Sequence, residues 1–240
     1  KRNLNVSKAA DSELRVYFRH VPLKIYEKST RHQGNRPSWF DWGLAWNFFF
    51  KSANESEIKI TIIFDGSEAD LLDDPIYKYV QKYNLRVILI SGGSEMASGI
   101  IMHNLIQLDI DSYQGFIYIL ENDYIHRNDW VEQLKRVLSN ANVSLLTLFN
   151  HPNNKGVDSS IKDWEVVQST TGSYIISAKL YRKTLFLAKI LRKDYRYFKA
   201  VTIAHKLLAP KVTCSQHAML GDISKTFDIR SFSKSTDVSS

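Results

Sequence analysis

The chain has 240 residues, of which 44% are hydrophobic and 24% charged, as in an ordinary globular domain. Its single cysteine, Cys214, excludes an internal disulfide framework and a cysteine-based zinc site, and it fits a reducing, cytoplasmic compartment. The formal net charge is +7, so we expect an anionic partner: nucleic acid, an anionic membrane surface or a phosphorylated small molecule. There is no apolar run of membrane-spanning length and no signal peptide, but the chain begins with Lys1 rather than Met, as a domain excised from a longer protein would.

Segments of two kinds alternate along the chain. Short runs rich in Val, Ile and aromatic residues predict strands at 15–20, 59–65, 86–91, 116–123, 143–149, 172–177 and 212–217. Helical spacing of apolar residues predicts helices at 42–52, 70–83, 95–108, 129–140 and 192–209. This alternation favours an α/β fold, a single Rossmann-like domain with a mainly parallel central sheet flanked by helices. We expect the domain to span 14–228, between a flexible N-terminal segment (1–13) and a flexible tail or linker remnant (229–240).

Polar residues and glycines stand at the ends of several predicted strands. In open α/β sheets, ligands bind outside the carboxyl ends of the strands. A glycine after a strand is most simply a turn, but the whole set predicts one polar rim at one edge of the sheet. Its members are Arg19 and His20, Asp65 and Gly66, Ser91, Gly92 and Gly93, and Glu121 and Asp123.

The stretch Glu121-Asn122-Asp123 places two acids at the end of a buried strand. Side chains alternate along a strand, so Glu121 and Asp123 are expected to point the same way. Carboxylates are ligands for Mg²⁺ or Mn²⁺, and such an ion would neutralise a diphosphate leaving group. The alternative is a solvated strand end or a helix N-cap.

The segment LENDY-x-H-R (120–127) resembles the metal motif of GT-A-fold glycosyltransferases. More narrowly, it is similar to a microbial and viral group that carries E-D-D-Y followed by His and Arg or Lys. Other segments resemble that group in the same order, and the resemblance covers roughly 14–223. They are RVYFRH (15–20), RPSWFDWGLAWNFF (36–49), TLFNHPNNK (147–155) and DWEVVQSTTGSYIIS (163–177). The departure is Asn122, where the group often has Asp; the middle position is expected to point away from the metal.

The resemblance implies a role for each matching position. The fold would be GT-A-like, the cofactor a divalent metal (Mn²⁺ or Mg²⁺), the donor a nucleotide-sugar and the acceptor a glycan or glycolipid. Asp123 would bind the metal and His217 would complete its shell. Glu121 would meet the ribose or a metal-bound water. The nucleobase and ribose would be held by Arg19, His20 and Asp65, and the helix after Ser91-Gly92-Gly93 would turn Ser98 and Asn104 toward the donor. His126 and His151 are expected to be structural or to support the ligands.

An inverting transfer needs a general base on the acceptor hydroxyl. Many inverting GT-A enzymes place it in an acid pair at the start of a late helix, and Lys193-Asp194 matches that position. Asp194 is the only acid among the ten Lys and Arg residues of 179–211, so its ionised form is favoured. The alternatives are an N-cap role for Asp194, a base at Glu165 or Asp163, or a retaining reaction that needs no such base.

The cations of 179–211 allow two interpretations. They form either a solvated face or a surface for an acidic glycan or a lipid phosphate at a membrane. No nucleic-acid recognition motif is present, so we expect no nucleic-acid partner.

A rival function is a nucleotide-binding or nucleotidyl-transfer domain with the same α/β core, or a non-catalytic glycan-binding relative. Sugar-activating nucleotidyltransferases have a Gly-rich basic signature just after their first strand. The segment VPLKIYEKSTRHQG (21–34) lacks it, which favours the glycosyltransferase.

Overall fold

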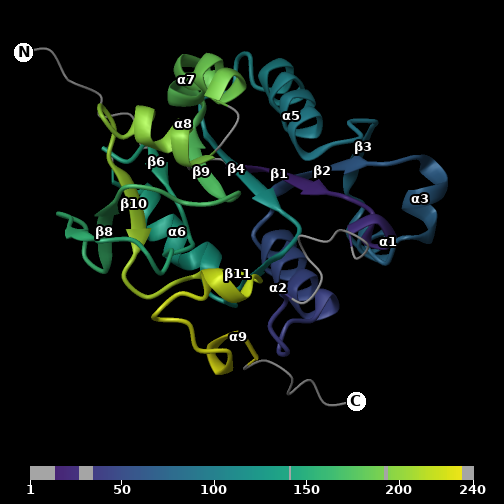
Figure 1. The fold of residues 1–240 in the computed structure, drawn as a ribbon, viewed down its shortest axis with the longest axis horizontal. Coiled ribbons are helices and arrows are strands. Elements are labelled where there is room, and N and C mark those ends of the chain that lie inside the picture. Colours follow the sequence, from purple (N-terminus) through teal and green to yellow (C-terminus); the bar gives the residue numbers. More distant parts are fainter. Residues whose placement is uncertain (1–13, 27–34, 141, 192–193, 234–240) are drawn as a thin grey trace, which may run out of the picture.

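The computed structural model describes residues 14–26, 35–140, 142–191 and 194–233 (Figure 1). Within them lies a nine-stranded mixed sheet with the order β3-β2-β1-β4-β9-β6-β10-β8-β7. Its strands are β1 (Leu14–His20), β2 (Lys59–Asp65), β3 (Arg86–Ile90), β4 (Phe116–Glu121), β6 (Leu145–Leu146), β7 (Val157–Asp158), β8 (Trp164–Val167), β9 (Tyr174–Ser177) and β10 (Leu207–Pro210).

The half of the sheet that carries the candidate rim is parallel. β1 pairs with β2 on one side and β4 on the other, and β2 pairs with β3. In this register Arg19 lies opposite Glu121, so the carboxyl ends of β1 and β4 meet. Antiparallel pairing begins where β9 joins β4.

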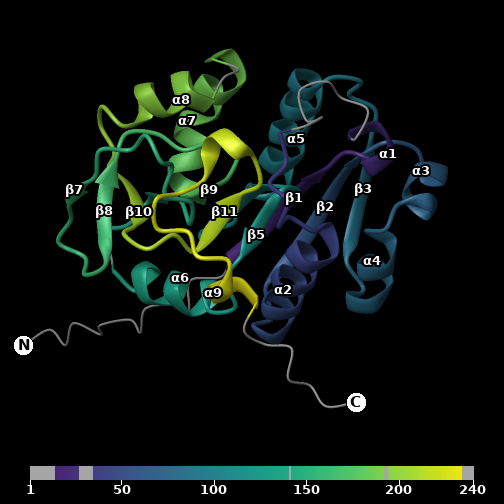
Figure 2. The same cartoon turned by 60° about the horizontal axis from the view of Figure 1, so that its bottom comes forward.

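Helices cover both faces of the sheet (Figures 1 and 2). One face is covered by α2 (Trp42–Glu55), α4 (Tyr77–Tyr83) and α6 (Trp130–Leu138), and the other by α5 (Glu95–Asp109), α7 (Ala178–Leu191) and α8 (Asp194–Val201). The remaining helices are α1 (Leu23–Tyr26), α3 (Glu68–Asp73), the 3-10 turn η1 (Leu220–Asp222) and α9 (Arg230–Ser233).

Strand alternation divides the core into two clusters. Val16 and Phe18 of β1 pack on the α2 side, whereas Tyr17 packs on the α5 side. Arg19 and His20 therefore leave β1 toward opposite faces. A separate two-stranded sheet joins β5 (Tyr124–His126) to β11 (Ser215–His217) just beyond β4.

The α/β architecture with a mixed, largely parallel sheet confirms the predicted fold class. Predicted strand 59–65 coincides with β2, and the predicted helices at 42–52, 95–108 and 129–140 correspond to α2, α5 and α6. Predicted helix 70–83 is instead broken into α3 and α4. The break falls at Asp74, whose backbone is extended before Pro75, because proline disfavours the helical region for the residue that precedes it.

The late part of the chain differs more from expectation. The predicted helix 192–209 ends at Val201, and its last residues form β10 instead. Ile203, an apolar residue of this predicted helix, is 86% exposed in the connection between α8 and β10. Predicted strand 143–149 contributes only the two residues of β6, and 212–217 contributes β11, which lies outside the central sheet.

The folded region extends past residue 228. Phe232 of α9 is fully buried, and its ring centroid lies 5.0 Å from that of Phe227. The flexible tail expected at 229–240 therefore contains an apolar anchor. Residues 1–13, expected to be flexible, lie outside the described residues. Among the helices that the structure describes, none combines the length and hydropathy of a membrane-spanning segment.

Candidate metal and nucleotide site

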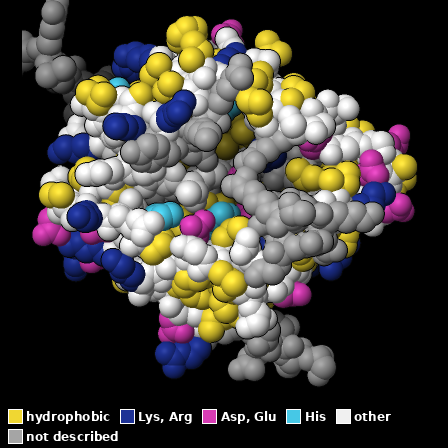
Figure 3. All heavy atoms as spheres, in the orientation of Figure 1, with side chains coloured by type: hydrophobic (Ala, Val, Ile, Leu, Met, Phe, Trp, Pro, Cys, Tyr) yellow, Lys and Arg dark blue, Asp and Glu magenta, His cyan; other side chains and the backbone are white. Residues whose placement is uncertain are grey.

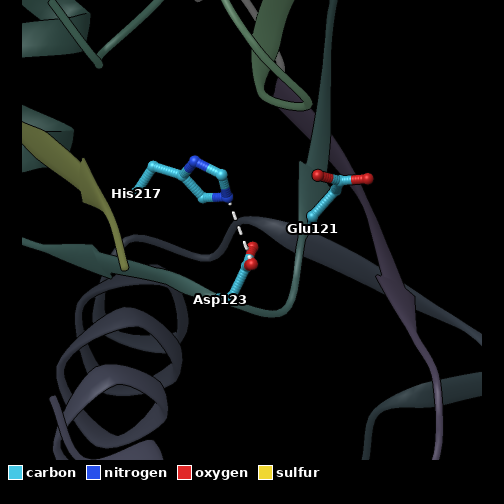
Figure 4. Close-up of side chains that lie close together, drawn as sticks. All are labelled: Glu121, Asp123 and His217. Carbon is cyan, nitrogen blue, oxygen red and sulfur yellow. Dashed lines mark hydrogen bonds and ion pairs between the residues drawn. The ribbon is translucent and has the colours of Figure 1, made fainter. Parts of the chain in front are cut away.

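Glu121, Asp123 and His217 converge beyond the end of β4 (Figure 4). Each offers one ligand atom, and these atoms lie within 4.8 Å of one another. Nε2 of His217 lies 3.1 Å from Oδ2 of Asp123. Asp123 is only 3% exposed, so it is neither a solvated strand end nor a helix N-cap.

The β5–β11 pair brings His217 to Asp123. His217 lies opposite Tyr124 in this antiparallel pair, and the backbone N–H of Ala218 donates to the carbonyl of Asp123 at 2.9 Å. The rings of Tyr124 and His217 are stacked, with centroids 4.8 Å apart. The Tyr that follows Asp123 in the motif thus fixes the orientation of the imidazole.

Acidic neighbours hold a proton on His217. Burial by itself lowers the pKa of His217, but the charge of Asp123, hydrogen bonds to Asp123 and Asp222, and the charge of Glu121 outweigh it and raise the pKa to about 10. Nδ1 of His217 lies 2.7 Å from Oδ2 of Asp222, which orients the ring from its other side. A metal ion that takes Nε2 as a ligand must displace this proton.

Arg36 also contacts the site, although no prediction from the sequence gave this residue a role. Its guanidinium donates to Oδ2 of Asp123 at 3.1 Å and to the carbonyl of Ala218 at 2.5 Å. It lies over the rings of Phe40 and Trp42, each 5.2 Å from its central carbon. A guanidinium held beside the acids is suited to binding phosphate. The only signal in the sequence is its place in RPSW, just before α2.

Glu121 lies at the end of β4 and is held from two sides. Arg19 of β1 forms an ion pair with it, as the register of the two strands predicts. Gly172 passes over it with φ of +43°, and a Cβ at Gly172 would overlap the Glu121 carboxylate. Glycine is therefore required at this position for both its conformation and its size.

The donor set fits a divalent cation. Two carboxylates and an imidazole are ligands that Mn²⁺ accepts, whereas Mg²⁺ prefers oxygen ligands alone. Glu121, Asp123 and His217 are the residues that would hold the ion. Asp222 would orient the imidazole from the other side, as carboxylates commonly do for metal-bound histidine.

His20 and Asn122 face the opposite side of the sheet from Glu121. His20 has no exposed surface, so it does not offer the ligand a surface as the rim prediction expected. Nδ2 of Asn122 lies 3.1 Å from Nδ1 of His20, whose Nε2 lies 3.0 Å from Oδ1 of Asp74. Because Nδ1 accepts from the amide, the imidazole proton sits on Nε2 and the ring is neutral. Burial lowers the pKa of His20, which agrees with this assignment. Asn122 thus points away from Asp123 and Glu121, as predicted.

Asp65 joins the ends of β2 and β3. It accepts hydrogen bonds from the backbone N–H of Gly92, at 2.7 Å, and from the Ser98 hydroxyl. A Cβ at Gly92 would meet the Ser98 backbone nitrogen at 2.7 Å, so this loop needs glycine. Gly93 has a φ of +66°, and Ser91 is exposed beside it.

Gly66 is packed tightly as well, since a Cβ there would meet the Phe64 ring at 2.8 Å. Asp65, Gly66 and Gly92 therefore fix the conformation of the loops at the carboxyl ends of β2 and β3. The exposed Asn104 is not part of the cavity wall.

A cavity of about 880 Å³ opens beside Glu121, between α5 and the α7–α8 pair. Its wall includes Arg19 and Glu121 from the strand ends, His103 from α5 and Gly172. Nδ1 of His103 lies 2.8 Å from the Tyr181 hydroxyl, and burial with the charges of Lys189 and Arg19 lowers its pKa to about 4. In the view of Figure 3, histidine and acidic side chains lie together near the middle of the molecule.

The three base candidates are placed differently. Asp194 is the first residue of α8, but its side chain lies outside the described residues. Asp163 and Glu165 belong to the β8 region and do not line the cavity. Glu165 accepts a hydrogen bond from the Asn150 amide at 2.7 Å.

No family model matches the chain, and no curated protein matches it. Solved structures do resemble it. Residues 1–349 of TarS from S. aureus match with a TM-score of 0.51 and 14% identity over 83% of this chain, which spans 58% of that structure. GalNAc-T7 with UDP, GalNAc and Mn²⁺ matches with a TM-score of 0.52 and 12% identity, over 90% of this chain and 46% of that one.

A third match has the same fold with a different chemistry. A Bacillus anthracis protein described as a glucose-1-phosphate thymidylyltransferase, in complex with sucrose, matches with a TM-score of 0.53 and 12% identity. The match covers 95% of this chain and 97% of that one. At these identities the likeness shows the fold alone: the chain has a GT-A-like α/β fold, which glycosyltransferases and nucleotidyltransferases share.

Proposed function

We propose that the protein is a divalent-metal-dependent glycosyltransferase that moves a sugar from a nucleotide-sugar donor to a glycan or glycolipid acceptor. The observation that carries the proposal is the meeting of Glu121, Asp123 and His217 at the carboxyl end of β4, next to the 880 Å³ cavity. Ligands of open α/β sheets bind at this edge. The GT-A-like fold and the motif around Asp123 support the same reading.

Each charged group has a defined task in this proposal. Bound at the three ligands, the metal ion would neutralise the charge that develops on the leaving diphosphate. Arg36 is close enough to Asp123 to bind the same phosphates. Arg19 holds the Glu121 carboxylate at the cavity wall, where it can accept hydrogen bonds from ribose hydroxyls. Asp65 and Gly92, which are hydrogen-bonded to each other, shape the loop that would border the nucleotide.

We assign the general base of an inverting transfer to Asp194. The backbone of α8 begins at this residue, and Arg196 and Tyr197 of the same helix line the cavity. The start of α8 is thus at the border of the space in which an acceptor would lie. A base there would take the proton of the acceptor hydroxyl during attack on the anomeric carbon.

The decisive experiment is a titration with nucleoside diphosphates. UDP, GDP, CDP, ADP and dTDP are each added with Mn²⁺, with Mg²⁺ and with EDTA, and the melting temperature is followed. One of them should stabilise the protein only when metal is present, by about 2.7 kcal/mol when its concentration is about 100 times its Kd. If none of them does so with either metal, the proposal fails.

A nucleotidyltransferase is the second candidate, because the thymidylyltransferase-like structure matches nearly the whole of both chains. The two reactions release different products. A glycosyltransferase converts a nucleotide-sugar to a nucleoside diphosphate, whereas a nucleotidyltransferase forms pyrophosphate from a nucleoside triphosphate and a sugar phosphate. Assays of both products with the nucleotide selected by the titration decide between them.

A further inference from the structure

Helix α7 exposes a stripe that its packing does not use. Lys179, Lys183, Phe186 and Ile190 are all exposed and follow each other at helical spacing, so they share one face. The opposite face buries Leu180, Tyr181 and Leu185. Phe186 is 70% exposed and Ile190 is 53% exposed, so two large apolar side chains lie one helical turn apart on the solvent-facing side of α7, as in an exposed apolar patch.

Helix α8 and the turn after it also expose basic and apolar side chains. Arg196 and Lys199 are exposed on α8, and Ile203 and Lys206 are exposed just beyond it. Figures 1 and 2 both show α7 and α8 side by side at one end of the molecule. Figure 3 shows basic and hydrophobic side chains interspersed along this edge. We call these eight residues the α7–α8 face: Lys179, Lys183, Phe186, Ile190, Arg196, Lys199, Ile203 and Lys206.

The cations of the α7–α8 face differ from other cations of residues 179–211 that contact partners within the protein. Arg182 donates to the carbonyls of Ile110 and Tyr113 at 2.8 Å each, so it caps the end of α5. Lys211 pairs with Asp158 at 2.6 Å. By contrast, the structure shows no ion pair between a cation of the α7–α8 face and an acid of the described residues.

We propose that the α7–α8 face docks the protein onto an anionic lipid bilayer. Cations that form no ion pair with the acids of the described residues match the negative surface of such a bilayer. A soluble polyanion would account for the cations but not for exposed Phe186, Ile190 and Ile203, whose burial among acyl chains adds affinity. The inference goes beyond the proposed transfer reaction, because docking needs neither metal nor donor.

The position of the face agrees with a membrane-borne acceptor. Ile190 and Arg196 belong both to the face and to the wall of the 880 Å³ cavity. A bilayer on this face would therefore lie at the border of the cavity. A lipid with a sugar or phosphate headgroup could reach the cavity without leaving the bilayer.

The test is co-sedimentation of the protein with vesicles, without metal or nucleotide. Vesicles of phosphatidylcholine alone are compared with vesicles that contain about one-third phosphatidylglycerol. We expect binding to the anionic vesicles only, with an affinity that falls as salt rises. Absence of binding to anionic vesicles would overturn the proposal, whatever the outcome of the nucleotide titration.

Two double variants separate the electrostatic from the apolar contribution to vesicle binding. Lys179→Glu with Lys183→Glu should weaken binding at least about tenfold, because each change replaces attraction by repulsion. Phe186→Ser with Ile190→Ser should also weaken it at least about tenfold, since apolar burial is lost. If the serine variant binds as the parent does, the attraction is general electrostatics and the α7–α8 face is not a docking surface.

Matched controls come from α3 and α4, whose buried residues Leu71 and Tyr79 belong to the core cluster on the α2 side, whereas the buried apolar residues of α7 belong to the other cluster. Lys78→Glu with Lys82→Glu has the same four-residue spacing on α4, and Leu72→Ser removes an apolar side chain that is 54% exposed. Both controls should bind vesicles within about twofold of the parent, as changes distant from the contact do. Equal losses in the control and test variants would also overturn the proposal.

Discussion

Nε2 of His217 lies 3.1 Å from Oδ2 of Asp123, although 94 positions separate the two residues in the chain. The β5–β11 pair closes this distance, and Tyr124 stacks on the imidazole. The candidate metal site therefore depends on the late part of the chain folding back onto the end of β4. A change at either residue should affect both the local structure and metal binding.

Asp123→Asn should abolish metal-dependent nucleotide binding. The amide keeps the size of the carboxylate but loses the charge that binds the ion and that holds Arg36 and His217. We expect metal affinity to fall at least about a hundredfold. The free energy of unfolding without metal should fall by about 1–3 kcal/mol, because buried donors lose a charged acceptor. Calorimetric titration with Mn²⁺ and urea denaturation measure the two effects.

The control for this variant is Asp111→Asn, an acid exposed on the surface. It should leave the free energy of Mn²⁺ binding and the free energy of unfolding unchanged within about 0.5 kcal/mol. Unchanged Mn²⁺ affinity in Asp123→Asn would remove Asp123 from the metal site.

Gly172→Ala should damage the site without removing a ligand. Alanine at φ of +43° is strained, and its Cβ would overlap Glu121, so the loop and the carboxylate must move apart. We expect a loss of about 1–2 kcal/mol in unfolding free energy and weaker Mn²⁺-dependent nucleotide binding. Gly99→Ala on α5 is the control, because its Cβ would meet nothing within 4 Å. It should raise stability by about 0.5–1 kcal/mol. A Gly172→Ala protein as stable as Gly99→Ala would contradict the structure.

Local pattern was sufficient for much of the fold. β2 was predictable because it is a continuous run of buried, mostly β-branched and aromatic residues. α2 was predictable because its apolar residues recur at helical spacing after the Asp41 N-cap. β10 was not, because Leu207–Pro210 has only four residues and continues the apolar spacing of α8. It is a strand because β8 pairs with it, which is a tertiary effect.

In the candidate site, too, some residues could be predicted from the local sequence and others could not. Glu121 and Asp123 could be found because an acid pair closes a buried strand. Strand alternation could have separated Arg19 from His20, since neighbours on a strand face opposite sides. Arg36 and Gly172 were beyond local reasoning, because each meets its acidic partner across a long separation in the chain. Arg36 reaches Asp123 from a position 87 residues away.

Asp74→Ala should be among the more destabilising single changes. Asp74 is buried and accepts hydrogen bonds from His20 and from the backbone N–H groups of Leu23 and Ile76. Alanine would leave three buried donors without an acceptor, so we expect a loss of about 3–5 kcal/mol. Asp73→Ala is the matched control, because the neighbouring side chain is 75% exposed. That change should stay within about 0.5 kcal/mol in chemical denaturation. Similar losses in both variants would rule out the buried network as the cause.

Stability should fall as the pH is lowered below about 6.5, in part through His126. Burial lowers the pKa of His126 to about 3, although a backbone hydrogen bond to Tyr124 opposes the shift. Between these two pKa values, about 6.5 in the unfolded chain and about 3 in the folded protein, His126 takes up a proton only in the unfolded chain. Acid therefore favours unfolding. The contribution of one such histidine is about 1.4 kcal/mol per pH unit. His126→Gln removes it, so its unfolding free energy should depend less steeply on pH between about 6 and 4. An unchanged slope would show that His126 is not held neutral in the folded protein.

Asp194→Asn separates a general base from a helix cap. Asparagine keeps the size of aspartate and caps helices equally well, but it cannot take the proton of an acceptor hydroxyl. Loss of a general base costs about 10²–10⁴ in rate, whereas loss of a cap costs about 1 kcal/mol of stability. The variant should therefore bind Mn²⁺ and nucleotide normally, melt near the parent temperature and transfer sugar at least about a hundredfold more slowly. Transfer at the parent rate would leave Asp194 as a cap only. The base would then be Glu165 or Asp163, or the reaction would retain configuration and need no base. The configuration of the product, measured by NMR, decides between those two outcomes.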